Sequence, residues 1–562
     1  MTHTLTEGGQ IISHRLRMLR QVLRVAIFCS LLFGLGTFTY FMTRVPRVAY
    51  SATWYYLKAW FYAGAFTDLE VDGKFLSQIS KANYSYSPKL PLEYVKKLTQ
   101  PIVIKLAYEA YSNALKSIIA SSVCFVAILA FFLLKGTSAK TEKHISGLKI
   151  SSPRWLAWRL KFTKKASNFL IGTLPLVKGT ETRHMMVTGG TGSGKTNCLH
   201  HLLVQIRDQK QKTIIIDTCG IFVEKYYRPD KDIILNPFDK RSAQWNPWAE
   251  GDTPFDYADI AESFIPHSNS DHDSYWRDAS KTVFSTLLEK FADTRKTSDI
   301  VQWLQYESLA NLCKLMAGTP AAAHMDLSSE KTASSIRSVS STFLSSLRAL
   351  EDTSTPFSIR EWLERDDDSW LFIQSVSKQR TILRPLMAAW ISASIRGLLA
   401  LKPNLDRRIW FIIDELPTLQ RVKDLESLLT EGRKYGGCGV LVLQTPAQLD
   451  EIYGREVSQV ITANTATKIV FQEEDPLIAD RISRAFGERE ITERQEGISY
   501  GAHETRDGVS LSMQKKSKPI VSPTQILQLP VNTAFVKLAS GSGITKVRLN
   551  IINHDKLKHK SL

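Results

Sequence analysis

Cysteine is scarce in this chain, and its few cysteines are not arranged as a metal site or a disulfide framework. The 562 residues include six cysteines. None of the six forms a C-x-x-C pair or stands with histidine at the spacing of a zinc site. Cys29 and Cys124 lie in apolar segments, and the other four are scattered after residue 183. The sequence therefore indicates neither a cysteine-based metal module nor a disulfide-stapled fold.

Excess charge is missing from most of the chain as well. The formal net charge is +17, and all of this excess lies in residues 1–183, whereas residues 184–562 are neutral overall. A neutral region offers no general electrostatic attraction for nucleic acid. Any nucleic-acid binding by residues 184–562 needs a local basic patch or a ring of basic side chains.

Charged residues are also absent from two apolar runs. VAIFCSLLFGLGTFTYFM at 25–42 is 18 residues long, and IIASSVCFVAILAFFLL at 118–134 is 17 residues long. Both lengths lie at the short end of the range for spanning helices. The alternatives are buried core helices or, for the first run, a signal peptide, although residues 40–42 (Tyr, Phe, Met) are a poor cleavage site. Two such runs around one module favour two transmembrane spans.

A glycine-rich loop is the most informative motif. Residues 189–196 read GGTGSGKT, a G-x-x-x-x-G-K-[ST] pattern, between the apolar run HMMVTG and the helical pattern NCLHHLLVQIRDQ. In this context backbone amides bind phosphate oxygens, and the start of the helix adds its dipole. Lys195 would reach the β- and γ-phosphates, and the Thr196 hydroxyl would ligate Mg²⁺. We therefore predict that ATP is bound by Gly189, Gly190, Thr191, Gly192, Ser193, Gly194, Lys195 and Thr196.

The flanks of the two apolar runs predict their orientation. Basic residues precede the first run and follow the second: Arg15, Arg17, Arg20 and Arg24, and then Lys135, Lys140, Lys143, Lys149, Arg154 and Arg159. The segment between the runs also holds Arg44 and Arg47, so the charge signal alone is not clean. ATP is cytosolic, however, and the phosphate loop must be too. We expect both termini in the cytoplasm and the intervening segment in the periplasm.

Strand and helix patterns alternate after the phosphate loop. Beta-branched and aromatic runs typical of buried parallel strands are TIIIDT (213–218), SWLFIQS (369–375), IWFIIDE (409–415), GVLVLQT (439–445) and ATKIVFQ (466–472). Between about 249 and 355 such runs become sparse, and amphipathic stretches such as SKTVFSTLLEKFA dominate. This pattern predicts a P-loop α/β sheet interrupted by an all-helical subdomain.

Four downstream side chains complete a predicted ATPase site. IWFIIDE ends in two acids, of which Asp414 would hold Mg²⁺ and Glu415 would orient and activate the attacking water. Gln444 ends the next strand and would contact the γ-phosphate or the water, unless it only caps the strand. Arg433, with Lys434 as the alternative, would stabilise transition-state charge across a subunit boundary. Cations are also common at helix ends, so a solvated helix end remains the other interpretation.

The ordered set of motifs resembles the coupling proteins of conjugative type IV secretion systems, specifically the TraD-like branch. The strings that carry the resemblance are GGTGSGKT, IIIDTCGIF, ILNPFDKRSAQWNPW, WFIIDELPTL, LLTEGRKYGG and VLQTPAQLDEIYG. The resemblance implies a RecA-like hexameric ring ATPase, related to FtsK-type DNA translocases, that brings relaxase-bound single-stranded DNA to the secretion channel. It also implies that Lys195, Thr196, Asp414, Glu415, Gln444 and Arg433 carry the roles argued above.

Two departures from the family pattern matter. Ile221 follows Gly220 where the family often has an acidic residue, so no catalytic role is assigned to position 221. The tail HDKLKHKSL is short, whereas some relatives carry a long C-terminal extension that binds relaxosome proteins. We expect that docking route to be absent or replaced.

Rival functions remain open at this point. A coupling ATPase that recruits only protein effectors would use the same ATPase, and the presence of a relaxase gene and transfer origin nearby would favour DNA. A non-transport membrane protein regulated by nucleotide is disfavoured because binding alone needs no water-activating Glu415. An ABC transporter is disfavoured because the chain has no evident signature motif and too few spans.

The sequence thus predicts a membrane-anchored, multi-pass inner-membrane ATPase. The partners that the resemblance implies are single-stranded DNA, the relaxase or relaxosome, secretion-channel proteins and further copies of itself in a homo-hexamer. The predicted parts are a cytoplasmic N-terminus (1–24), a first span (25–43), a periplasmic segment (44–116), a second span (117–135), a basic cytoplasmic linker (136–183), a RecA-like domain (184–248 and 356–553), a helical subdomain (249–355) and a tail (554–562).

Overall fold

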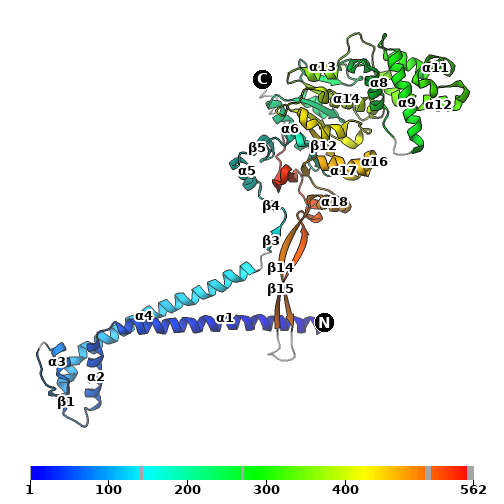
Figure 1. The fold of residues 1–562 in the computed structure, drawn as a ribbon. Helices are drawn as coiled ribbons and strands as arrows, with labels where there is room; N and C mark the ends of the chain where they lie inside the picture. The colour runs from blue at the N-terminus through cyan, green and yellow to red at the C-terminus, as the bar shows by residue number, and fades with distance from the viewer. Residues whose placement is uncertain (1, 81, 140–142, 268–270, 500–507, 553–562) are drawn as a thin grey trace. The chain divides into compact units, whose positions relative to one another are not determined.

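The computed structural model describes residues 2–80, 82–139, 143–267, 271–499 and 508–552 (Figure 1). The predicted tail at 554–562 lies outside the described residues. The chain forms two compact units, Met1–Lys143 with Arg494–Met513, and His144–Glu493 with Gln514–Leu562. Each unit is described by itself.

Two long helices dominate the N-terminal unit. Helix α1 (Thr2–Thr43) packs against α4 (Leu92–Ala139), and the Ser121 hydroxyl on α4 donates a hydrogen bond to the Ser30 carbonyl on α1 at 2.7 Å. A Cβ added at Gly34 would lie only 3.1 Å from the Ser121 Cβ, so the two backbones approach closely at this point. Small residues at such a crossing are typical of helices packed inside a membrane.

Both helices are long and apolar enough to cross a membrane. The candidate spans are Leu16–Thr43 and Leu92–Lys135, and only 11% and 6% of their apolar windows are buried inside the protein. Large apolar side chains, among them Phe28 and Val123, therefore face outward. A bilayer would cover these side chains, because neither helix hides them against protein. Each helix extends beyond the uncharged run from which its span was predicted, since a helix does not have to end where the hydrocarbon does.

The segment between the two long helices folds into a small α/β substructure with a core of its own. It contains α2 (Arg47–Phe61), β1 (Asp68–Glu70), α3 (Gly73–Ile79) and β2 (Lys89–Pro91), and β1 pairs with β2 in an antiparallel ladder. The Tyr55 and Phe75 rings stack with centroids 4.8 Å apart in its core. Helix α4 begins at Leu92, so the last part of the segment predicted as periplasmic already belongs to that helix.

A ten-stranded sheet organises the second unit. In sheet order the strands are β4 (Ile150–Ser151), β17 (Gly543–Arg548), β16 (Thr533–Leu538), β13 (Thr467–Val470), β7 (Met185–Thr188), β12 (Gly437–Leu443), β11 (Ile409–Ile413), β8 (Lys212–Asp217), β10 (Trp370–Gln374) and β9 (Ile233–Leu235). The strands from β13 to β9 are parallel, whereas β16 and β17 add to the sheet in antiparallel order. The parallel strands therefore present all their carboxyl ends at one edge of the sheet.

The central strands are apolar on both faces because helices cover both. On β8, Ile214 and Ile216 pack into one core, and Ile215 packs into the other. Helix α6 (Lys195–Asp208) covers the second face, and α14 (Arg380–Ala400) covers the first. Helix α14 is also long and apolar enough to cross a membrane, but 78% of its apolar window is buried inside the unit. It is a core helix of a doubly covered sheet.

The prediction of a linker over 136–183 is wrong from residue 144 onward. This stretch supplies strand β4, helix α5 (Pro153–Phe162) and the paired strands β5 (Ala166–Ile171) and β6 (Leu174–Val177). Leu156 and Leu160 on α5 are buried in the core that α6 also lines. The basic composition suggested a linker, but the lysines and arginines lie on the outer face of an amphipathic pattern.

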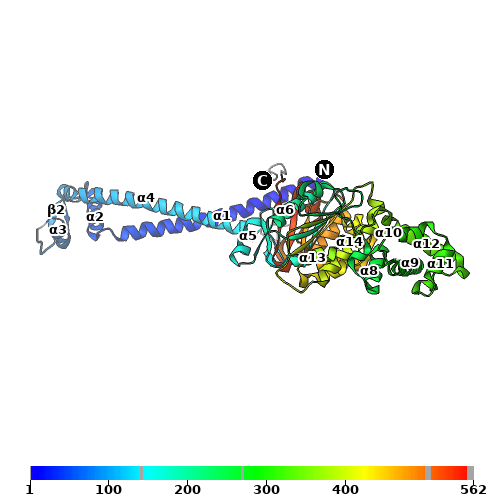
Figure 2. The ribbon, with the colours of Figure 1, turned by 90° about the horizontal axis from the view of Figure 1, so that it is seen from above.

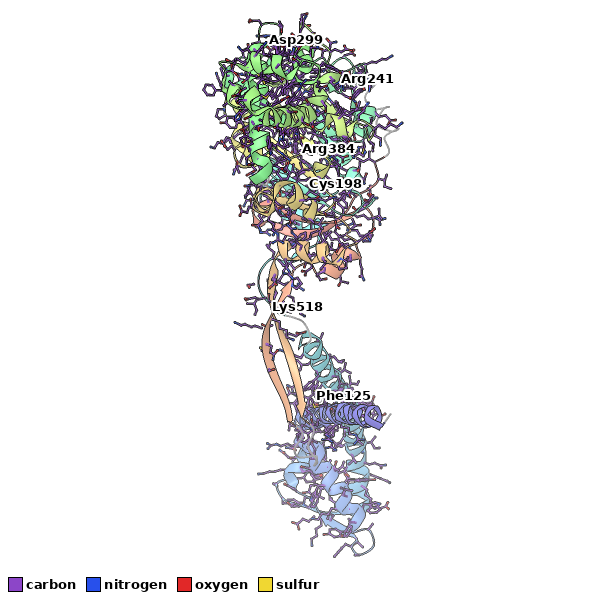
Figure 3. The ribbon with its side chains drawn as sticks, turned by 90° about the vertical axis from the view of Figure 1, so that its right-hand side faces the viewer. Phe125, Cys198, Arg241, Asp299, Arg384 and Lys518 are labelled. Atoms are coloured by element: carbon purple, nitrogen blue, oxygen red, sulfur yellow. The ribbon has the colours of Figure 1, made fainter. Side chains whose placement is uncertain are left out.

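Helices fill the chain between β9 and β10, where the described residues contain no strand. They include α8 (Pro254–Phe264), α9 (Asp271–Lys290), α10 (Thr297–Val301), α11 (Leu309–Met316), α12 (Glu330–Phe343) and α13 (Ile359–Glu364). Helices α9, α11 and α12 lie together at one end of the unit (Figures 1 and 2). Figure 3 marks this region by Asp299 on α10 and the sheet region by Cys198 on α6. The core of the helical insertion is continuous with one face of the sheet, and within it the rings of Phe264 and Phe284 meet edge to face.

Strands β9, β14 (Glu488–Ser499) and β15 (Gly508–Pro519) are among the described strands that the sequence patterns did not predict. Strand β9 ends in the ILNPFD segment, and its three residues are too few to show a period. Strands β14 and β15 form a separate three-stranded sheet with β3 (Lys143–Ser146). Strand β14 is rich in charged residues and lacks the apolar alternation by which a strand is recognised, whereas β15 does alternate Val509, Leu511 and Met513 with polar residues, a signal that sequence reasoning overlooked. Lys518 marks β15 in Figure 3.

Candidate nucleotide site

The phosphate loop connects β7 to α6 at the carboxyl edge of the sheet. Gly189, Gly192 and Gly194 have φ angles of +152°, +73° and +118°, which side chains rarely allow. A Cβ at Gly189 would lie 2.6 Å from the Phe471 Cβ, and one at Gly194 would lie 2.7 Å from the Asn532 Oδ1. Glycine is therefore required at both positions by backbone conformation and by space.

Two segments distant in sequence hold the loop in place. The amide of Gly190 donates to the Gln472 carbonyl at 2.7 Å, just after β13. The amide of Asn532 donates to the Ser193 carbonyl at 2.9 Å, just before β16, and its Oδ1 accepts from the Asn197 side chain at 3.1 Å. Asn532 has φ +58°, a conformation that asparagine tolerates better than most residues. Sequence reasoning missed these supports, because only the strand order brings them to the loop.

Lys195 lies at the centre of the loop. Its ammonium donates hydrogen bonds to the carbonyls of Gly189 at 2.6 Å and Gly190 at 2.8 Å. Burial lowers the pKa of Lys195, whereas the charges of Glu415, Glu473 and Asp414 act in the opposite direction. The acidic side chains that act on the ammonium thus come from the segments that follow two different strands, β11 and β13.

Asp414 and Glu415 follow β11 directly, at the same edge of the sheet. Burial, together with the neighbouring charges of Asp217 and Glu415, raises the pKa of Asp414 to about 7 against the opposing effect of Lys195. A crowded, desolvated carboxylate of this kind gains much from a divalent cation. Asp217 is already occupied, because its carboxylate accepts from four backbone amides, those of Cys219, Gly220, Phe222 and Val223.

The Thr196 hydroxyl and the Asp414 carboxylate are suitable oxygen ligands for a Mg²⁺ ion that is bound together with phosphates. Thr196 is the second residue of α6, and Asp414 stands across the same edge. Within the described residues no cluster of three or more His, Cys, Asp or Glu side chains could hold a metal by itself. Mg²⁺ in nucleotide sites takes one or two protein oxygens and completes its shell with phosphate and water, so a larger cluster is not needed.

Gln444 lies at the end of β12, beside Glu415. Its side-chain amide donates to the Glu415 carboxylate at 3.3 Å. Burial raises the pKa of Glu415, and this hydrogen bond partly offsets that rise. The structure therefore brings Lys195, Asp414, Glu415 and Gln444 to one edge, which is what an ATPase site requires; their individual roles stay predictions.

Arg433 and Lys434 are not part of this group in the same chain. Both lie in the short helix η8 (Gly432–Tyr435), which precedes β12, whereas Gln444 follows it. Because β12 runs parallel to β7, η8 lies at the opposite edge of the sheet from the phosphate loop. Seven strand residues separate the two edges by roughly 20 Å. Arg433 cannot reach the nucleotide of its own subunit without a large rearrangement.

Arg380 is a cation near the site that sequence reasoning missed. It begins α14, its guanidinium donates to the Thr218 carbonyl at 2.8 Å, and its charge lowers the pKa of Glu415 against the effect of burial. Its Nε is buried and has no hydrogen-bond partner among the described residues. The segment SVSKQR offers no recognisable motif, so nothing in the sequence marks this arginine.

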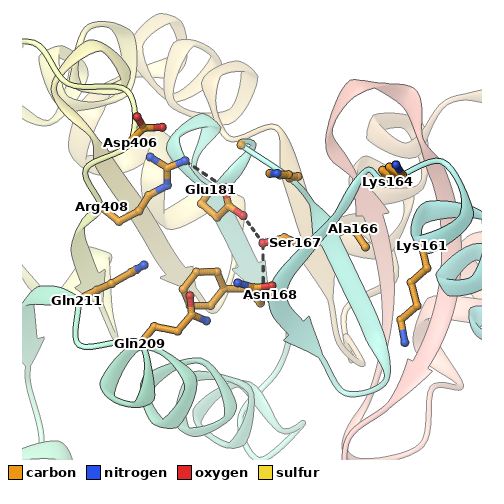
Figure 4. Close-up of a pocket in the computed structure, with 13 residues that line it drawn as sticks. Lys161, Lys164, Ala166, Ser167, Asn168, Glu181, Gln209, Gln211, Asp406 and Arg408 are labelled. Carbon is orange, nitrogen blue, oxygen red and sulfur yellow. Dashed lines mark hydrogen bonds and ion pairs between the residues drawn. The ribbon is translucent and has the colours of Figure 1, made fainter.

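A separate cavity of about 440 Å³ lies at the opposite edge of the sheet (Figure 4). Asp406 and Arg408 line it just before β11, and Gln211 lines it just before β8. Glu181 accepts a hydrogen bond from Ser167 and stands 3.8 Å from the Arg408 guanidinium. This cavity is formed at the amino ends of the parallel strands and is not part of the nucleotide site.

Gly194→Ala is expected to weaken nucleotide binding far more than Gly192→Ala. The new Cβ at 194 would lie 3.0 Å from the Asn532 Cα and would adopt a φ of +118°, whereas a Cβ at 192 meets nothing within 4 Å among the described residues. We expect a loss of at least tenfold in ADP affinity for Gly194→Ala and of about fivefold or less for Gly192→Ala, measured by titration calorimetry. Equal losses of affinity in both variants would contradict the conclusion that Asn532 leaves no space for a side chain at position 194.

Comparison with known proteins places the chain in a family. The family model for the type IV secretion-system coupling protein DNA-binding domain matches residues 168–550. The chain is 31% identical over 569 residues to the coupling protein TraD of Escherichia coli (strain K12), covering 98% of this chain and 78% of TraD. It is 25% identical over 220 residues to a conjugal transfer protein TraG of Escherichia coli, covering 36% of this chain and 34% of TraG.

Solved structures agree with this result. The bacterial conjugative coupling protein TrwB superposes with a TM-score of 0.67 at 29% identity, covering 73% of this chain and 94% of the TrwB chain. TrwB has also been solved with ADP and Mg²⁺, and that structure matches with a TM-score of 0.66 at 28% identity, covering 73% of this chain and 95% of that one. These matches confirm the predicted RecA-like fold and the resemblance drawn from the ordered motifs. The chain belongs to the family of type IV secretion-system coupling proteins.

Proposed function

We propose that this coupling protein is a Mg²⁺-dependent ATPase whose turnover moves single-stranded DNA toward a type IV secretion channel. The observation that carries the proposal is the convergence of Lys195, Asp414, Glu415 and Gln444 at one sheet edge, with Gln444 hydrogen-bonded to Glu415. Nucleotide binding alone needs no carboxylate of this kind next to a polar amide. The solved complexes of TrwB with ADP and Mg²⁺ support the same choice of ligand.

Each side chain has a task that follows from its position. The amides of residues 189–196 and the Lys195 ammonium hold the phosphates, and Thr196 with Asp414 would hold Mg²⁺, which neutralises phosphate charge when bound. Glu415 orients a water molecule and accepts its proton. Gln444 fixes the Glu415 carboxylate and offers its amide to the water or to the γ-phosphate.

A ring of subunits completes the site in this proposal. Arg433 lies at the sheet edge away from its own nucleotide, so it can act only on the nucleotide of a neighbouring subunit. A homo-hexamer, implied by the resemblance to the TraD-like branch, supplies such a neighbour at every site. The central channel of a ring would also gather basic side chains around DNA, although residues 184–562 are neutral overall.

The N-terminal helices anchor this ring in the inner membrane. Both are candidate spans with outward apolar side chains, so the protein crosses the membrane twice, with both termini in the cytoplasm and the layer around Tyr55 and Phe75 in the periplasm. We assign the relaxase with its bound DNA, and the secretion-channel proteins, as partners of this anchored motor.

ATPase activity of the purified full-length chain, with and without single- and double-stranded DNA, tests the function. Stimulation by single-stranded DNA is expected from a DNA-moving motor. Turnover that responds to a secreted protein and not to any DNA would support a coupling ATPase for protein effectors only. No nucleotide hydrolysis under any condition would overturn the proposal.

DNA affinity is expected to fall steeply with salt and to depend little on sequence. Because residues 184–562 carry no net charge, binding rests on local phosphate contacts in a pore or at the membrane-proximal face. Fluorescence anisotropy of labelled oligonucleotides between low and physiological salt measures this slope. Strong sequence preference with a flat salt dependence would contradict it.

A further inference from the structure

A buried acid stands beside the phosphate loop and has no part in the mechanism above. Glu473 follows β13 by three residues and is only 2% exposed. Its Oε1 is fully buried and has no hydrogen-bond partner among the described residues. Its negative charge acts on Lys195. Because β13 and β11 lie on opposite sides of β7 in the sheet, Glu473 approaches the Lys195 ammonium from the side away from Asp414 and Glu415.

The backbone around Glu473 is tied to the loop, so this acid cannot simply swing away. The preceding residue, Gln472, accepts a hydrogen bond from the Gly190 amide at 2.7 Å. One residue earlier, Phe471 is packed so closely that a Cβ at Gly189 would lie 2.6 Å from it. The Gln472 side chain is held by the Leu527 carbonyl at 3.2 Å. The backbone at Glu473 is therefore held in a fixed position relative to the phosphate loop.

A carboxylate at this position opposes the binding of phosphates. Both groups are negative, and both are attracted to the Lys195 ammonium. Burial, with smaller contributions from Asp475 and Glu474, raises the pKa of Glu473 to about 7 against the opposing charge of Lys195. Within the described part of the chain, no group donates a hydrogen bond to the buried Oε1 of this carboxylate.

We propose that Glu473 is a positioning residue that serves as the internal counter-ion of Lys195 and thereby weakens the binding of nucleotide phosphates. This inference rests on the proposed ATPase function and adds to it a determinant of nucleotide affinity. When phosphates enter the loop, they compete with the Glu473 carboxylate, which stays in place, for the Lys195 ammonium. A weaker hold on the phosphates speeds the release of ADP, which is useful in a motor that must turn over repeatedly.

Glu473→Gln tests this role, because it removes the charge and keeps the shape. We expect the Kd of a non-hydrolysable ATP analogue to fall by on the order of tenfold, the Kd of ADP to fall by less, and the Kd of AMP to stay unchanged. The expected effect decreases from the ATP analogue to AMP because Lys195 contacts the β- and γ-phosphates, and AMP has neither. The measurement is titration calorimetry on the full-length chain in detergent, with Mg²⁺ present.

Glu474→Gln is the matched control, since it makes the same charge change at the adjacent, exposed residue. We expect its Kd values to stay within about twofold of the unchanged protein, because water screens an exposed charge. Where Glu473→Gln does not fold, Glu473→Ser removes the same charge with a smaller side chain.

Two results would overturn the proposal. One is an unchanged or weaker affinity for the ATP analogue in Glu473→Gln. The other is a hundredfold loss of turnover at unchanged affinity, which would make Glu473 part of the chemistry. Failure of the unchanged protein to bind any nucleotide would instead overturn the proposed function, so the two failures are distinguishable.

Discussion

Glu415→Gln is expected to slow ATP turnover by about 100- to 10,000-fold while nucleotide stays bound. The amide keeps the shape of the side chain and can still pair with Gln444, but it cannot accept a proton from water. The measurement combines steady-state turnover with the affinity for a non-hydrolysable ATP analogue. Normal turnover in this variant would remove Glu415 from the mechanism.

Lys195→Ala is the matched comparison for Glu415→Gln. It removes the ammonium from the centre of the loop, so both affinity and turnover should fall. The pair of variants separates binding from chemistry at one site. A Lys195→Ala chain that binds ATP as tightly as the unchanged protein would contradict the assignment of the loop.

Arg433→Ala is expected to lower turnover on the order of a thousandfold or more without loss of ATP binding. Its position before β12 leaves the nucleotide of its own subunit out of reach. Mixing Arg433→Ala subunits with Lys195→Ala subunits should restore part of the activity, because an intact loop then meets an intact arginine. Turnover is measured against mixing ratio under conditions where subunits exchange.

Lys434→Ala is the matched control for the arginine, since the two cations are neighbours in the same short helix. A small effect of Lys434→Ala beside a large effect of Arg433→Ala would assign the role to Arg433. Turnover that stays at the level of the separate mutants at every mixing ratio would count against a shared site. A large effect of Lys434→Ala alone would transfer the role to that lysine.

The sequence by itself determined the features whose signal is local. The phosphate loop is recognisable because glycine, lysine and threonine are needed at fixed spacing by one turn and the start of one helix. Local signals also reveal the apolar strand before Asp414 and Glu415, and the two uncharged runs. Each of these segments is apolar over consecutive residues because the whole segment is removed from water. Order along the chain then sufficed to predict the family, which the comparisons confirmed.

Only the tertiary structure decided what surrounds the loop. Gln472, Glu473 and Asn532 reach it because β13 and β16 follow β7 in the sheet order, and that order leaves no periodic trace in the sequence. The same holds for residues 144–183, whose basic composition suggested a linker although their leucines enter the core. The parallel arrangement of β12 and β7 also placed Arg433 at the sheet edge that lies away from the nucleotide site of its own chain. Contacts between distant segments depend on how strands are arranged, whereas sequence patterns report only on how each segment is buried.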